Sequence, residues 1–160
     1  MRYAFQICAA RLLTATVLAL CPISATAQQN WQRYVAEIGG SVDVPRHIFT
    51  EEAGKPETGH GALFLTSDRR ANLTVQSLRN DANDTPSAFL AKKRPPANIV
   101  YRRITPNFFV VSSVRNDLIW YNRCNFAGRL ITCVLINYPA AEQKRWDAPV
   151  TRISNSLSKG

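Results

Sequence analysis

The C-terminal half of the chain holds the pattern that most constrains the fold. Three runs alternate apolar residues with other residues, and short turn-rich pieces separate them: 108–114, 118–126 and 130–138. Alternation with a period of two indicates strands, and short connections indicate antiparallel neighbours. Asn116-Asp117 can form the first turn because both residue types tolerate positive φ, and Gly128-Arg129 suits a type II′ turn. These runs predict a three-strand antiparallel meander.

Two cysteines test the register of the second turn. If Gly128 and Arg129 are the two loop residues, Cys124 lies directly opposite Cys133. The pair then falls in a non-hydrogen-bonded site, where Cα atoms lie about 4.5 Å apart, and disulfides accept separations from about 4.4 Å. A turn shifted by one residue instead places Cys124 opposite Ile131. We expect the bridged register, with two free thiols as the alternative.

This register divides the meander into two faces. The first face holds Phe109, Val111, Ser113, Trp120, Asn122, Cys124, Phe126, Ile131, Cys133 and Leu135. The second face holds Phe108, Val110, Val114, Ile119, Tyr121, Arg123, Leu130, Val134, Ile136 and Tyr138. Both faces are largely apolar, which in a small domain implies cover on both sides. We expect part of that cover to be helical.

Caps and apolar spacing indicate two helices. Pro86–Lys93 follows the N-cap residue Thr85 and ends in lysines before a Pro-Pro pair. The second helix is expected to begin after Asp147 as N-cap, with Pro149 in its first turn. Its apolar stripe is formed by Val150, Ile153 and Leu157. A short piece over 140–146 is a third candidate.

The N-terminal half gives weaker patterns. We expect 31–38 to be helical or irregular, 40–45 to be a strand and 47–61 to be a polar loop. A hairpin formed by 62–66 and 72–78, and a strand over 99–104, complete the expected elements. The expected fold class is therefore α+β, with residues 28–160 forming a single domain. Its antiparallel sheet contains the C-terminal three-strand meander and is covered by two or three helices.

Residues 1–27 have the features of a secretory signal peptide. Arg2 and Arg11 precede a nine-residue apolar stretch over 12–20, and residues 25–27 form an A-x-A cleavage site. Proline and polar residues interrupt the apolar run before it reaches the roughly 20 residues that a membrane anchor needs. Cys21 leaves lipidation as an alternative, although the residue before it is not small. We expect a periplasmic or secreted protein with no transmembrane span after cleavage.

The order of the elements and two of their segments resemble a known family. The chain has a strand with the sequence SVDVP at 41–45, a hairpin, a helix, the aromatic run 108–138 and a closing helix. This order resembles the PsbP/Mog-like superfamily of small α+β domains, and in particular exported proteins of Gram-negative bacteria with this layout. The matching residues are structural and mark no site. The resemblance implies a binding or assembly factor and transfers no catalytic residue.

The chain contains no catalytic or metal-binding signature. His47 and His60 lie in the expected polar loop, but their spacing with two nearby glutamates matches no metal-ligand motif. We therefore expect a non-catalytic protein with no cofactor and no metal. The alternative is a small envelope hydrolase or lyase with an unrecognised site around Arg123, Asp43 or His60, which would have to meet in a cleft.

Basic residues supply the candidate binding positions. The net charge is +9, from 20 lysines and arginines against 11 acids. The candidate binding residues are Arg69, Arg70, Lys92, Lys93, Arg94, Tyr101, Arg102 and Arg103. If these converge, they suit an anionic envelope component or an acidic envelope protein. If they do not, they are dispersed charges that keep the protein in solution. Nucleic acid is not expected, because export separates the protein from it.

Three aromatic residues, Tyr101, Trp120 and Tyr121, are candidates for lining a pocket, with core and cross-strand packing as the alternative. The function expected from the sequence is an exported, disulfide-stabilised binding or accessory protein whose partner is an envelope protein or an anionic envelope component.

Overall fold

The computed structural model describes residues 30–158, so the signal peptide expected over 1–27 lies outside the described residues. The strands are β1 (Trp31–Val35), β2 (Ser41–Pro45), β3 (Phe49–Glu52), β4 (His60–Thr66), β5 (Asn72–Arg79), β6 (Ile99–Ile104), β7 (Phe108–Arg115), β8 (Leu118–Ala127) and β9 (Leu130–Pro139). The helices are α2 (Pro86–Lys93), the 3₁₀ turn η1 (Ala140–Glu142) and α3 (Gln143–Ser156). No helix within 30–158 is long and apolar enough to cross a membrane.

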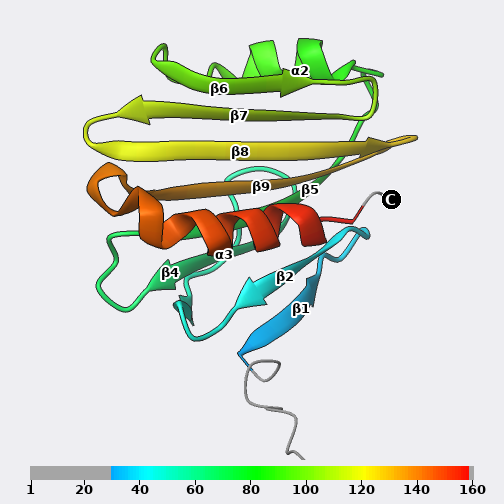
Figure 1. Ribbon diagram of the computed structural model, residues 1–160. Coiled ribbons are helices and arrows are strands. Elements are labelled where there is room, and N and C mark those ends of the chain that lie inside the picture. The colour runs from blue at the N-terminus through cyan, green and yellow to red at the C-terminus, as the bar shows by residue number, and fades with distance from the viewer. Residues whose placement is uncertain (1–29, 159–160) are drawn as a thin grey trace, which may run out of the picture.

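Seven strands form one antiparallel sheet in the order β3-β4-β5-β9-β8-β7-β6, and β1 and β2 form a separate two-stranded hairpin (Figure 1). The consecutive strands β7, β8 and β9 are antiparallel neighbours. The expected three-strand meander is therefore only one part of a larger sheet. The larger sheet arises because β5 pairs with β9, which joins the β3-β4-β5 group to the C-terminal strands.

The register of the β8–β9 hairpin is the one that the cysteines predict. Cys124 pairs with Cys133, their Cα atoms lie 4.1 Å apart, and a disulfide joins them. Gly128 in the turn has a φ of 56°, which the first position of a type II′ turn requires. Asn116 and Asp117, in the preceding turn, also have positive φ, at 50° and 60°. Turn chemistry and the disulfide thus agree on one register.

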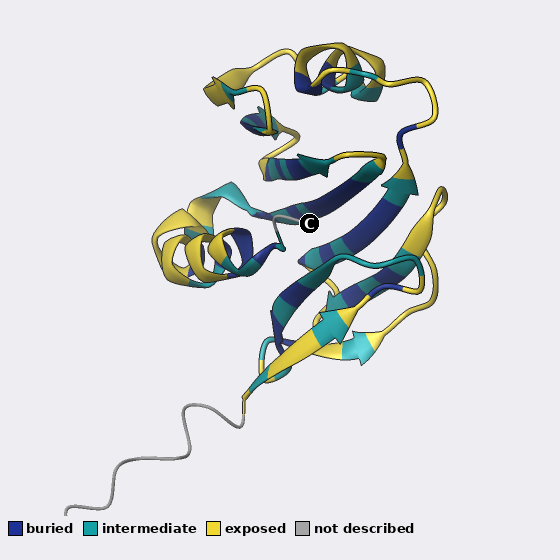
Figure 2. Ribbon diagram, turned by 90° about the vertical axis from the view of Figure 1, so that its right-hand side faces the viewer, coloured by how far each residue is buried: buried dark blue, intermediate teal, exposed yellow. Residues whose placement is uncertain are grey.

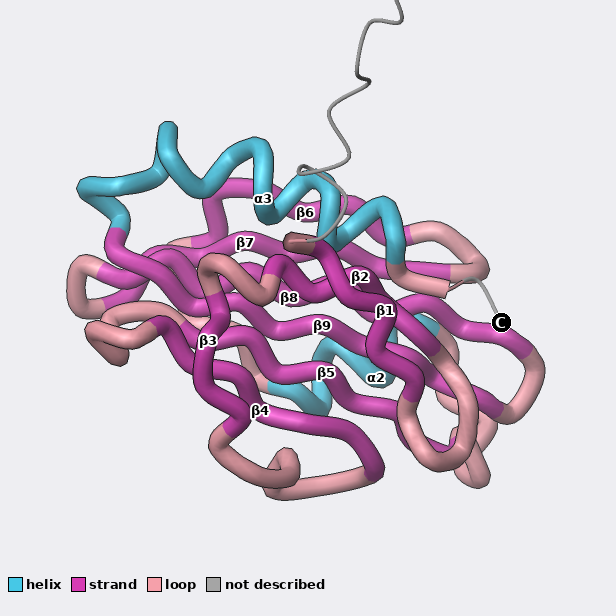
Figure 3. The backbone as a smooth tube through the Cα atoms, turned by 90° about the horizontal axis from the view of Figure 1, so that it is seen from below, coloured by secondary structure: helices cyan, strands magenta, loops and turns pink. Residues whose placement is uncertain are grey.

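Helices α2 and α3 lie on opposite sides of the sheet (Figure 3). Beneath α2 lies a buried cluster of Leu90, Phe109, Val111, Cys124, Ile131 and Cys133. Beneath α3 and the β1–β2 hairpin lies a larger cluster that includes Val42, Val44, Phe49, Phe64, Leu73, Val75, Val134, Ile136, Trp146 and Ile153. The two faces predicted for the meander therefore both carry a core.

Helix α2 has the bounds and the N-cap that the sequence predicts. The hydroxyl of Thr85 accepts a hydrogen bond from the backbone N–H of Ala88, and Pro86 occupies the first turn. The helix ends at Lys93, and the next residue, Arg94, caps it in the left-handed conformation with a φ of 48°.

Helix α3 begins earlier than expected. It starts at Gln143, so Asp147 lies inside the helix rather than at its N-cap, and Pro149 is an internal residue. The reason is the burial of Trp146, which is 4% exposed and packs against the rings of Phe49 and Tyr138. Burying this ring extends the apolar stripe by one turn and outweighs the hydrogen bond lost at the proline. The helix turns its buried side to the sheet and its exposed side to solvent (Figure 2).

Two N-terminal expectations are also wrong. Residues 31–35 form strand β1 rather than a helix or an irregular segment, and strand β3 lies within the segment expected to be a loop. Strand β1 is held by its pairing with β2, and β3 is anchored by Phe49, which is fully buried. Both strands are short, and β3 contains an irregularity in its pairing with β4. Neither segment alternates apolar with polar residues, since β1 reads WQRYV and β3 reads FTEE, so periodicity signals a strand in neither.

Candidate binding site

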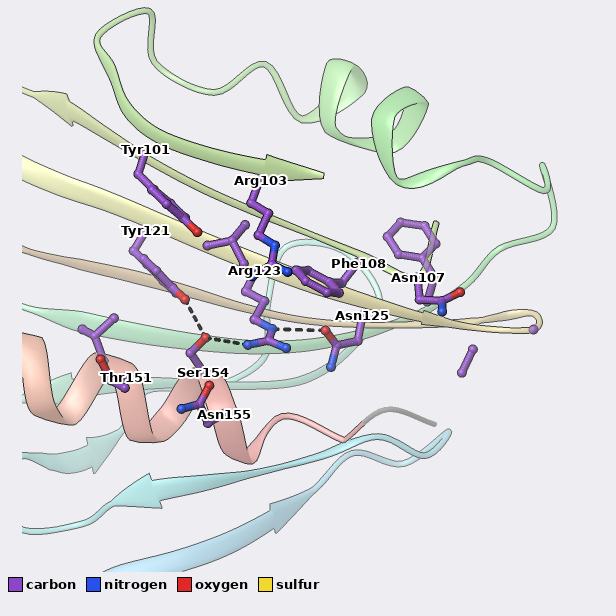
Figure 4. A pocket seen from close by; sticks show the side chains of 15 residues that line it. Tyr101, Arg103, Asn107, Phe108, Tyr121, Arg123, Asn125, Thr151, Ser154 and Asn155 are labelled. Atoms are coloured by element: carbon purple, nitrogen blue, oxygen red, sulfur yellow. Dashed lines mark hydrogen bonds between the residues drawn. The ribbon is translucent and has the colours of Figure 1, made fainter. Parts of the chain in front are cut away.

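A pocket of about 910 Å³ lies between helix α3 and the face of strands β6, β7 and β8. We call it the α3 groove and define it by Tyr101, Arg103, Phe108, Tyr121, Arg123 and Ser154, which line it (Figure 4). The first five residues come from the sheet, and Ser154 comes from the side of α3 that faces them.

Cross-strand pairing brings these side chains together. Arg103 pairs with Val110 and Val110 pairs with Arg123, so the three residues form one row across β6, β7 and β8. Paired residues in an antiparallel sheet point to the same face, and alternate residues of one strand do so too. Tyr101 therefore lies on the same face as Arg103, and Tyr121 on the same face as Arg123. This is the face on which α3 packs, in the part that the helix does not cover.

The guanidinium of Arg123 is held in a fixed position by neutral groups. Its Nε donates to Oδ1 of Asn125 at 3.2 Å, and its Nη1 donates to Oγ of Ser154 at 3.1 Å. Its Cζ lies 5.0 Å from the centroid of the Phe108 ring, in a cation–π contact. The side chain is half-buried. None of these three contacts supplies a negative charge.

Ser154 joins the helix to two strand residues of the groove. It is 4% exposed, and its Oγ accepts a second hydrogen bond, from the hydroxyl of Tyr121 at 2.6 Å. Burial raises the pKa of Tyr121, and the Ser154 hydrogen bond and the Arg123 charge only partly counteract it. The phenol therefore remains protonated near neutral pH and stays a donor to Ser154.

Asn125 holds the segment that follows α3 against the groove. Its Nδ2 donates to the carbonyl oxygens of Leu157, at 3.2 Å, and Ser158, at 3.0 Å. Its Oδ1 accepts from Arg123. The Asn125 amide thus fixes the position of the Arg123 guanidinium and of the segment that follows α3. The geometry of the groove therefore depends on how α3 packs on the sheet.

The groove carries positive charge without a compensating carboxylate. The guanidinium of Arg103 lies 5.4 Å from the same Phe108 ring that Arg123 contacts. No aspartate or glutamate lines the pocket. The ion pairs formed within residues 30–158 include neither Arg103 nor Arg123. The arrangement is suited to binding an anionic group.

Of the eight candidate binding residues named from the sequence, Tyr101 and Arg103 line the groove. Arg69 and Arg70, in the turn between β4 and β5, pair with Glu51 and Glu142, and Lys92, on α2, pairs with Asp84. The candidate residues therefore do not converge into one patch.

The remaining candidates lie on the α2 side of the sheet or at its edge. Lys93 and Arg94 line a smaller pocket of about 270 Å³ beside Trp120, and Trp120 packs on the cluster beneath α2. Arg102 pairs with Val111, whose side chain belongs to that same cluster, so it points away from the groove. Of the three candidate aromatic residues, Tyr101 and Tyr121 share the groove, and Trp120 does not.

The three residues suggested for a hydrolase do not meet. Asp43 pairs with Arg33 at 2.8 Å, and Nδ1 of His60 lies 2.9 Å from Oε2 of Glu37. Arg123 lies in the groove, where its hydrogen-bond acceptors are neutral. Among the residues that the structure describes, no three His, Cys, Asp or Glu side chains gather into a potential metal site.

Three residues of the site were not predicted: Phe108 and Asn125 as contacts of Arg123, and Ser154 as its anchor on α3. The alternation of β8 already places Tyr121 and Arg123 on one face, and the register adds Phe108 and Val110. No local pattern indicates that Ser154 of the closing helix faces this row, because the position of α3 is set by its apolar stripe rather than by this serine.

Comparison with known proteins shows the fold. No protein-family model and no curated protein sequence matches the chain. Among solved structures, the solution structure of the cyanobacterial PsbP protein CyanoP from Synechocystis sp. PCC 6803 is similar, with a TM-score of 0.60 and 11% sequence identity over 88% of this chain and 98% of that chain. The likeness at this identity concerns the fold alone. This chain has a PsbP-like α+β fold, as the resemblance in its sequence implied.

Proposed function

We propose that this protein is an exported, non-catalytic binding or accessory protein of a bacterial cell envelope, and that it holds its ligand or partner in the α3 groove. The proposal of export is supported by the signal-peptide pattern over 1–27. The disulfide between Cys124 and Cys133 supports it further, since such bridges persist in oxidising compartments.

The observation that carries the proposal is the fixed guanidinium of Arg123. Moving a cation partly out of water costs free energy, and a neighbouring carboxylate commonly offsets this cost. In the groove the acceptors are Asn125 and Ser154, which are neutral, and Arg103 adds a second positive charge. An anionic group on the ligand or partner is the complement that this arrangement lacks.

The lining of the groove also supports binding rather than catalysis. It contains no His, Asp or Glu, which are the side chains that most often act as a general base, so no such base in the lining stands ready to activate the hydroxyls of Ser154 and Thr151. Burial raises the pKa of the Tyr121 phenol in this lining, which makes that phenol a poorer base near neutral pH.

In-cell crosslinking of the tagged protein in its native compartment, followed by purification at low and high salt and mass spectrometry, tests the proposal. Three forms are compared: the unmodified chain, Arg123→Gln and Arg102→Gln. Arg102 is the matched control, because it lies on the same sheet but faces away from the groove. We expect a specific component to be retained by the unmodified chain and by Arg102→Gln, and to be lost with Arg123→Gln. Equal retention by all three forms contradicts the proposal.

A further inference from the structure

Two side chains of the α3 groove retain hydrogen-bond donors after their contacts within the protein are made. Arg123 uses Nε and Nη1 for Asn125 and Ser154, and its Nη2 takes part in neither bond. Ser154 accepts from both Tyr121 and Arg123, so the hydrogen of its own hydroxyl is engaged in neither of these bonds. Ser154 is buried, which orients this donor better than a freely rotating surface hydroxyl.

A third donor group comes from the opposite wall of the groove. Arg103 projects from β6, and its guanidinium lies within 5.4 Å of the Phe108 ring that also contacts Arg123. In Figure 4 the Arg103 side chain extends from β6 toward the Phe108 ring, and the Arg123 side chain extends toward Ser154 on α3. Both guanidinium groups lie against one ring, and neither pairs with a carboxylate within residues 30–158, so an anion in the groove is attracted by both charges.

The number of donors distinguishes between kinds of anion. A carboxylate has two oxygen atoms, which one guanidinium can satisfy in a bidentate pair. A phosphate group, free or as a monoester, offers at least three strong acceptor oxygens and, near neutral pH, about 1.5 to 2 negative charges. Two guanidinium groups and one hydroxyl, approaching from the sheet and from the helix, match the phosphate better in both charge and acceptor count.

We infer that the α3 groove binds a phosphate group, free or as a monoester, with Arg103, Arg123 and Ser154 as its donors. The inference rests on the proposed function, because it names the chemistry of the ligand that this groove takes. Phe108 forms the floor between the two guanidinium groups, and Tyr121 holds Ser154 in place through its hydroxyl. The remaining length of the pocket is available to the moiety that carries the phosphate.

The test is a calorimetric titration of the exported, processed protein, purified from the periplasm, with inorganic phosphate and with pyrophosphate. A physiological ionic strength of about 0.15 M screens non-specific attraction between exposed charges. We expect saturable binding that Arg123→Gln weakens about 10-fold or more, since a hydrogen bond to a charged group is lost. Arg103→Gln weakens it several-fold, and Arg102→Gln, the matched control, changes it less than twofold.

Two further variants separate a binding defect from a folding defect. Arg123→Lys keeps the charge but loses the planar fork, and we expect an affinity between those of the unmodified chain and Arg123→Gln. Arg103 is exposed, so Arg103→Gln keeps the fold and tests the site even if Arg123→Gln does not fold. Absence of saturable binding to both anions and to the vesicles described below overturns the inference, and so does equal weakening by Arg102→Gln.

The source of the phosphate is distinguished by a second arm with lipid vesicles. Flotation with phosphatidylcholine vesicles containing phosphatidic acid, against phosphatidylcholine alone, tests a lipid headgroup. Binding that requires phosphatidic acid and Arg123 assigns the phosphate to a lipid, and binding to the free anions alone assigns it to a soluble ligand. If the crosslinked component depends on Arg123 but phosphate neither binds nor competes, this inference fails and the proposed function stands.

Discussion

The face of the sheet beneath α3 has two halves of opposite character. In the covered half, Val75, Val134 and Ile136 are fully buried in the cluster beneath α3 and the β1–β2 hairpin. In the open half, β6 to β8 present Tyr101, Arg103 and Arg123 to the groove. The change takes place between neighbouring strands, because Arg123 pairs directly with Val134.

The contrast between the halves follows from the width of one helix. The apolar stripe of α3, formed by Trp146, Val150, Ile153 and Leu157, covers a strip of the sheet and no more. Beyond that strip the surface of the strands is either polar or covered by a ligand, since exposing apolar surface to water costs free energy. Ser154, beside the stripe, faces the boundary and connects the helix to Tyr121 and Arg123. The covered half therefore supplies stability, and the open half supplies the binding site.

The largest expected effect comes from removing the anchor of the covered half. Trp146→Ala should lower the free energy of unfolding by about 3–5 kcal/mol, because it removes a buried ring and leaves a cavity. Urea denaturation followed by circular dichroism measures this effect. Lys144→Ala, at an exposed position of the same helix, is the control and should change stability by about 0.5 kcal/mol or less. Similar effects of both substitutions would show that α3 does not dock through Trp146.

The disulfide lies beneath the boundary between the halves, on the opposite face of β8 and β9. Replacing both Cys124 and Cys133 by alanine should lower the free energy of unfolding by about 2–3 kcal/mol, because the unfolded chain loses a short closed loop. The register should persist, since nine residue pairs besides the cysteines join β8 to β9. Phosphate affinity should then change less than twofold. A larger loss of affinity would mean that the bridge itself positions Arg123.

A pH-dependent effect of intermediate size is expected in the covered half. Burial, with the negative charge of Asp147 second, raises the pKa of Tyr138 to about 12 from 10.0. Between these values the folded protein keeps a proton that the unfolded chain releases, so stability is full below pH 10 and falls as pH rises. Tyr138→Phe should reduce the loss of stability between pH 9 and pH 11 by about 1 kcal/mol. If the free energy of unfolding falls equally with pH in the two proteins, ionisation of the Tyr138 phenol is not the cause.

The smallest effect on stability is expected in the open half. Arg103→Gln should change the free energy of unfolding by about 0.5 kcal/mol or less, because the side chain is exposed and forms no ion pair within residues 30–158. The same substitution should weaken phosphate binding several-fold. Thermal unfolding with and without phosphate measures both effects on one sample. A large loss of stability without ligand would remove the distinction between the two halves.

Much of the fold followed from local patterns. The β8–β9 register could be derived because turn chemistry and cysteine pairing agree, and α2 could be bounded because Thr85 and the following prolines mark its ends. The start of α3 could not be derived, because Asp147 and Pro149 form a plausible helix start that the burial of Trp146 overrides. Strands β1 and β3 escaped prediction because each depends on pairing with a neighbour.

For the site, the residue types and the shared face were accessible from the sequence, and the convergence was not. Tyr101 and Arg103 were candidates for binding, and Tyr121 and Arg123 lay on one predicted face. The same reasoning included Arg69, Arg70 and Lys92, which form ion pairs elsewhere. Charge in a sequence shows how many cations are present, but the carboxylates that neutralise them come from distant segments.

The sequence by itself determined the alternation of the strands, the turns of the meander, the disulfide register and helix α2, because these depend on neighbours in the chain. Only the tertiary structure decided that β5 pairs with β9 and that α3 docks over β9 and beside β8. These contacts join segments far apart in the chain, and their free energy comes from burying apolar surface that several elements share. The groove lies at the edge of this buried surface, so its position depends on how all of these elements pack together.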